Sequence, residues 1–98
     1  MRIKTDYILS HEQGHFDIAE IFARKLNQLI KAYKFKSSAT AQKEVPAMYQ
    51  KIMNDLAAMQ NLYDSETDYS RNKAQQAAWL ERINKELNKL SEFADYKS

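Results

Sequence analysis

The sequence contains no cysteine and only one glycine and one proline among its 98 residues. Without cysteine, a disulfide framework and a thiolate zinc site are both excluded, so any bound metal ion must be held by nitrogen and oxygen ligands. Helix interiors exclude glycine and proline and favour Ala, Leu, Lys, Glu and Gln, which are frequent here. We therefore predict an almost entirely helical chain.

Long apolar runs and an excess of one charge are also missing. No stretch of eighteen apolar residues occurs, so no membrane span is predicted. The 15 basic and 13 acidic residues alternate along the chain and give a formal net charge of +2, without the basic stripe that phosphate binding requires. We therefore expect no nucleic-acid partner. The opening residues, MRIKTDYILS, are too short and too polar for a signal peptide.

Apolar residues recur every three and four positions in three segments separated by short polar links. This spacing predicts helices over about 6–34, 44–62 and 69–94. Hydrophobic residues make up 44 % of the chain, which is enough for a small core. We expect residues 1–98 to form a single all-α domain, a three-helix antiparallel bundle.

The start of the first helix has two interpretations. In the first, Thr5 or Asp6 caps the helix. In the second, Ser10 and Gln13 form a capping box, and the helix starts at residue 11, directly after Ser10. The earlier start is favoured because Ile8 joins the apolar face of the same helix.

The only two histidines of the chain lie in the first predicted helix, in the spacing H-E-x-x-H formed by His11, Glu12 and His15. Residues four apart on a helix lie one above the other, so both imidazoles can bind one ion. Glu12 lies about 100° further round, where it can take a proton from the attacking water without ligating the metal. The pattern is typical of zinc peptidases, in which this glutamate is the general base and acid.

A simpler interpretation is that His11 and His15 are ordinary half-buried residues of an amphipathic helix. Two observations favour a metal. Burial of unpaired imidazoles on the core-facing side costs free energy unless a partner satisfies them. Gly14 inside a helix costs about 0.5 to 1 kcal/mol relative to alanine, so something is expected to pack closely against its backbone.

Two stretches, LSHEQGHFDIAEIFARKL and YDSETDYSRNKAQQAAW, resemble a bacterial family known as domain of unknown function 922. Its members are described as predicted secreted zinc-dependent proteases. The resemblance implies a Zn²⁺ cofactor, a peptide or protein substrate and an extracytoplasmic location, periplasmic or secreted. It also implies that this helical chain could be part of a larger zincin-like α+β domain.

The resemblance implies that the third metal ligand is a histidine at the position that Tyr69 occupies here. A phenolate can also ligate zinc, so Tyr69 is predicted to complete the site of His11 and His15. Glu66 and Asp68 are alternative third ligands, as carboxylates are in other zinc enzymes. The competing interpretation of Tyr69 is an aromatic side chain that packs on the core at the start of a helix.

Three polar residues of the second stretch, Asp64, Thr67 and Asn72, are interpreted as turn and cap residues in preference to groups that orient the imidazoles. The sequence thus predicts a zinc-dependent peptidase-like protein with Glu12 as the catalytic residue. Two alternatives stay open. One is an inactive metal-binding relative, since no strand that could hold a peptide is visible before the first motif. The other is a helical protein-interaction module that binds no metal.

Overall fold

The structure is a computed structural model that describes residues 6–97, and it is all-α as predicted. Three long helices, α1 (Asp6–Ala32), α2 (Ser38–Glu66) and α3 (Lys73–Lys89), are followed by the short 3-10 helix η1 (Ser91–Lys97). Residues 6–97 contain no β-strand. Within this range no helix is long and apolar enough to cross a membrane.

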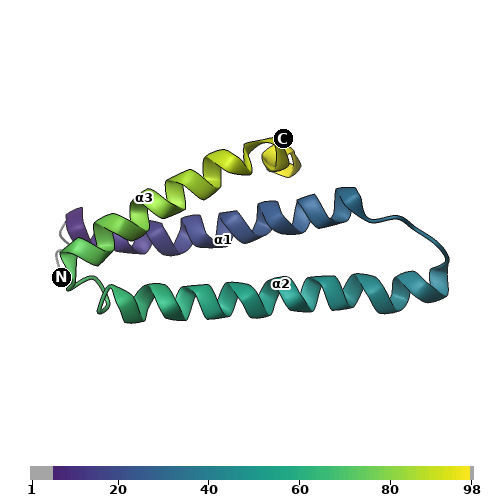
Figure 1. The fold of residues 1–98 in the computed structure, drawn as a ribbon, viewed down its shortest axis with the longest axis horizontal. Helices are drawn as coiled ribbons and strands as arrows, with labels where there is room; N and C mark the ends of the chain where they lie inside the picture. The colour runs from purple at the N-terminus through teal and green to yellow at the C-terminus, as the bar shows by residue number, and fades with distance from the viewer. Residues whose placement is uncertain (1–5, 98) are drawn as a thin grey trace, which may run out of the picture.

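The helices form a long hairpin with a shorter third helix laid along part of it (Figure 1). α1 and α2 run antiparallel along the molecule, which measures 52 × 28 × 23 Å. α3 turns back from the end of α2, packs along α1 and diverges from α2, so α1 contacts both other helices. The buried apolar side chains of the core lie between these helices: Ile18, Ile21, Phe22, Ile52, Tyr63, Trp79, Ile83 and Leu90.

α1 already includes Asp6, so the alternative start at residue 11 is wrong. Thr5, one of the two predicted caps, lies outside the described residues. The buried face of α1 includes Ile18, Ile21 and Phe22, whereas Leu29 and Ile30 are exposed. α1 contacts helices on two sides and therefore buries a wider face than a single apolar stripe. Leu29 and Ile30 belong to its last turns, near the far end of the hairpin.

α2 is longer than predicted at both ends. It begins at Ser38, where the hydroxyl of Ser37 accepts a hydrogen bond from the backbone N–H of Thr40 at 3.1 Å. Pro46 lies inside the helix at an exposed position, beyond its first turn. The helix continues to Glu66, so the segment that was interpreted as a turn after residue 62 is its last turn.

α3 starts later than predicted, at Lys73, because Asn72 is its cap and accepts from the backbone N–H of Gln75 at 3.1 Å. The turn before it, Asp68 to Ser70, has positive φ angles of 49°, 53° and 86° and cannot continue a helix. The predicted helix to residue 94 ends at Lys89 and is replaced by η1.

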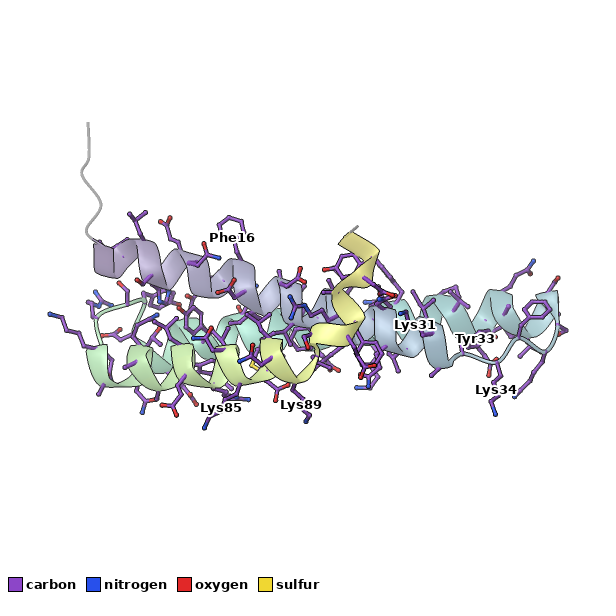
Figure 2. All side chains as sticks on the ribbon, turned by 90° about the horizontal axis from the view of Figure 1, so that it is seen from above. Phe16, Lys31, Tyr33, Lys34, Lys85 and Lys89 are labelled. Carbon is purple, nitrogen blue, oxygen red and sulfur yellow. The ribbon has the colours of Figure 1, made fainter. Side chains whose placement is uncertain are left out.

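η1 is fastened to the side of α1 by side-chain contacts. Asn27 donates to the carbonyl of Phe93 and to the carboxylate of Asp95, both at 2.8 Å, and Lys31 pairs with the same carboxylate. Tyr96 donates to Glu20 at 2.6 Å. Figure 2 shows this last segment passing across α1 near Lys31. These contacts hold η1 against the second half of α1.

Candidate metal centre

His11 and His15 lie one turn apart on α1, and both rings face α2. Their centroids are 5.1 Å apart and their planes are nearly perpendicular. The Nε2 atoms converge on one oxygen, Oδ1 of Asp64 on α2, at 3.0 Å from His11 and 2.6 Å from His15. His11 is 7 % exposed, whereas the side chains of His15 and Asp64 are 31 % and 27 % exposed. The site is therefore reached from solvent on the side of His15 and Asp64.

Asp64 was assigned wrongly from the sequence. It was interpreted as a turn residue because α2 was predicted to end at residue 62, but it lies in the last part of that helix and faces α1. Among the His, Asp and Glu side chains of the described range, His11, His15 and Asp64 form a group whose ligand atoms lie within 4.8 Å of one another. Asp64 lies in the second stretch that resembles the family. A second helix predicted to continue through residue 64 would have made this carboxylate a candidate ligand.

The Nδ1 atom of each histidine contacts a glutamine. Oε1 of Gln76, on α3, lies 2.6 Å from Nδ1 of His11, and Oε1 of Gln60, on α2, is hydrogen-bonded to Nδ1 of His15. Gln76 is buried, at 1 % exposure. Neither glutamine was singled out from the sequence, because only the tertiary packing brings α2 and α3 to these rings.

Tyr63 fills the space beneath the two rings and is fully buried. Its ring stacks on His11 with centroids 4.5 Å apart and planes 11° from parallel, and its hydroxyl donates to the backbone carbonyl of His11 at 2.9 Å. A Cβ atom at Gly14 would lie 2.1 Å from that hydroxyl oxygen. The prediction that something packs closely on Gly14 is confirmed, and the group is the tyrosine that supports the site.

The other predicted site residues have different surroundings. Glu12 follows His11 on α1 and is half-buried. Glu66 accepts a hydrogen bond from the indole of Trp79 at 2.8 Å, and Asp68 forms a salt bridge at 2.8 Å with the arginine three residues later. Tyr69 lies in the turn after α2 and is 65 % exposed, so its interpretation as a core aromatic is wrong, while its role as a ligand stays a prediction.

Thr67 and Asn72 have the turn and cap roles that were predicted. Thr67 is buried at the end of α2, where its hydroxyl donates to the carbonyl of Tyr63 at 2.6 Å. Asn72 caps α3. Both residues shape the chain reversal that brings Gln76 back to His11.

The donor set fits a divalent transition metal ion. Imidazole nitrogen and carboxylate oxygen are both zinc ligands, with bond lengths of about 2.0 to 2.2 Å, and a tetrahedral zinc ion keeps its ligand atoms about 3.3 Å apart. The separations of 3.0 and 2.6 Å around Asp64 Oδ1 would therefore need to widen by less than about 1 Å. His11, His15 and Asp64 supply three ligands, which leaves the fourth position of a tetrahedral site open.

Residues 4–72 match a family described as "Bacterial protein of unknown function (DUF922)". The matched range is more than half of the chain and contains His11, His15 and Asp64. No curated protein and no solved structure matches the chain.

Proposed function

The chain belongs to this bacterial family, and from that membership and the geometry of the site we propose that it is a zinc-dependent peptidase-like protein. The observation that supports the proposal is the convergence of His11 Nε2 and His15 Nε2 on Oδ1 of Asp64, at 3.0 and 2.6 Å. In this proposal Asp64 takes the place of third ligand that the sequence suggested for Tyr69. A peptide or protein substrate and an extracytoplasmic location are part of the same proposal.

The chemistry follows from the residues around the ion. When bound, a zinc ion supplies Lewis-acid chemistry, polarising a carbonyl and acidifying water. His11, His15 and Asp64 would hold it from two helices, and the partial exposure of His15 and Asp64 leaves the site open to solvent. Glu12, next to His11 in H-E-x-x-H, takes the proton of the attacking water and returns it to the leaving amine.

The test is peptide cleavage by zinc-loaded protein, with a mixture of unstructured peptides analysed by mass spectrometry. Glu12→Gln removes the proposed base and should lower the cleavage rate by roughly 10²- to 10⁴-fold. Glu81→Gln, at an exposed position on α3, is the matched control and should cleave like wild type. Equal rates for wild type and Glu12→Gln would exclude Glu12 as the base.

One observation favours a second candidate, a metal site that stabilises the fold without catalysis. The hydrogen bonds around the site join all three helices, because α2 contributes Gln60 and Asp64 and α3 contributes Gln76. A metal bound there would hold the hairpin and α3 together. Zinc binding in a protein that cleaves none of the peptides would support this candidate over the peptidase.

A further inference from the structure

We infer that Gln60 and Gln76 are positioning residues that fix both histidines in one tautomer, with the proton on Nδ1. Each Nε2 is then directed at Oδ1 of Asp64. The inference rests on the proposed function only in naming the ion as the partner of these two nitrogens. The proton on each Nδ1 itself follows from hydrogen-bond donors and acceptors in the protein.

The position of the proton on the His15 ring follows from the orientation of the Gln60 amide. The side-chain nitrogen of Gln60 donates to the backbone carbonyl of His15 at 2.9 Å. A carbonyl can only accept, so the amide of Gln60 has one satisfactory orientation, with Nε2 toward this carbonyl and Oε1 toward Nδ1 of His15. Because Oε1 is also only an acceptor, Nδ1 of His15 must carry the proton.

The position of the proton on the His11 ring follows from the orientation of the Gln76 amide, which Tyr63 fixes. The hydroxyl of Tyr63 uses its proton to donate to the backbone carbonyl of His11 at 2.9 Å, so it must accept the hydrogen bond from Nε2 of Gln76 at 2.8 Å. Oε1 of Gln76 therefore faces Nδ1 of His11 at 2.6 Å and accepts from it. The hydrogen bonds form a closed ring from His11 through Gln76 and Tyr63 back to His11.

This arrangement makes the site suited to a cation. Oδ1 of Asp64 is also only an acceptor, so a ring with its single proton on Nδ1 turns an Nε2 lone pair toward a carboxylate oxygen. The two repel unless a metal ion or a second proton on the ring lies between them. Histidine ligands are often oriented by carboxylates, which raise their basicity. Here the amides of Gln60 and Gln76 orient the rings without charge, so Asp64 supplies the single negative charge of the ligand set.

The experiment reads the tautomer directly by long-range ¹H–¹⁵N correlation NMR of the full chain, freed of metal with a chelator, at a pH where both rings are neutral. Both histidines of the wild type should carry the proton on Nδ1. Gln60→Met removes the acceptor of His15 and should convert that ring to the Nε2–H tautomer, which can donate to Asp64, while His11 stays unchanged as an internal control for folding.

Three further variants sharpen the result. Gln60→Glu keeps an oxygen beside Nδ1 and should preserve the wild-type tautomer, whereas Gln50→Met, at an exposed glutamine of the same helix, should change nothing. Zinc affinity should fall by about 10- to 100-fold in Gln60→Met. Gln76→Glu should preserve the tautomer of His11.

Two results would overturn the inference. One is an Nε2–H tautomer at either histidine of the wild type, which needs no variant and so does not depend on how a variant folds. The other is a Gln60→Met spectrum in which His15 is unchanged. Nδ1–H tautomers in a protein that binds no zinc would support the positioning role and contradict the proposed function, so the two failures are distinguishable.

Discussion

Gly14 and Tyr63 show how single residues support the site. Tyr63 stacks on His11, bonds to its carbonyl and accepts from Gln76, and it occupies the space that a side chain at position 14 would need. The glycine inside α1 is therefore explained by the approach of a ring and not by a turn or a kink. Replacing it disturbs the group that holds His11.

Gly14→Ala should lower the free energy of unfolding by about 1 to 3 kcal/mol, the usual cost of an overpacked core. The loss is expected even though alanine is favoured over glycine by about 1 kcal/mol in a helix interior. Urea unfolding followed by circular dichroism measures it, with Gln13→Ala at the neighbouring exposed position as control. A Gly14→Ala variant more stable than wild type would show that the tyrosine does not pack as described.

At the scale of elements, η1 is held to α1 by Tyr96 and its neighbours. Burial and the hydrogen bond to Glu20 raise the pKa of Tyr96 to about 12. The folded protein therefore keeps the phenol proton at pH values where the unfolded chain, with a tyrosine pKa of about 10, loses it. Stability from this contact is complete below pH 10 and is lost as the pH rises toward 12.

The prediction is a pH-dependent difference between wild type and Tyr96→Phe. Below pH 10 the wild type should be the more stable, and the difference in the free energy of unfolding should shrink between pH 10 and 12. Urea unfolding at several pH values measures this difference, with Tyr49→Phe, at an exposed tyrosine of α2, as control. A difference in the free energy of unfolding that stays constant across this range would show that the Tyr96 hydroxyl does not help to hold η1 against α1.

The helices themselves were largely predictable, and their ends were not. Apolar spacing located all three, but α2 begins at Ser38, six residues before the predicted start, because Ser37 caps it. α3 was predicted to start at residue 69, which lies in a turn of positive φ angles, and its cap is Asn72. Cap choice depends on how the chain reverses, which propensity alone does not determine.

At the scale of the whole molecule, the site depends on packing between helices. The pairing of His11 with His15 was visible in the sequence because it is a local property of one helix. Asp64 and the two glutamines lie 45 or more residues away along the chain and reach the rings only because α2 and α3 pack on α1. Their amide and carboxylate groups have many ordinary uses, so residue type alone could not assign them.

The most direct test of the central claim is calorimetric titration of the chelator-treated chain with zinc. Wild type should bind one ion per chain, and Asp64→Asn should weaken binding by at least about tenfold, since it removes a charged ligand. Asp55→Asn, at another carboxylate of α2 that pairs with a lysine on the same helix, should bind like wild type. Absence of zinc binding by the wild type, or equal binding by Asp64→Asn, would contradict the account of His11, His15 and Asp64 as a metal centre.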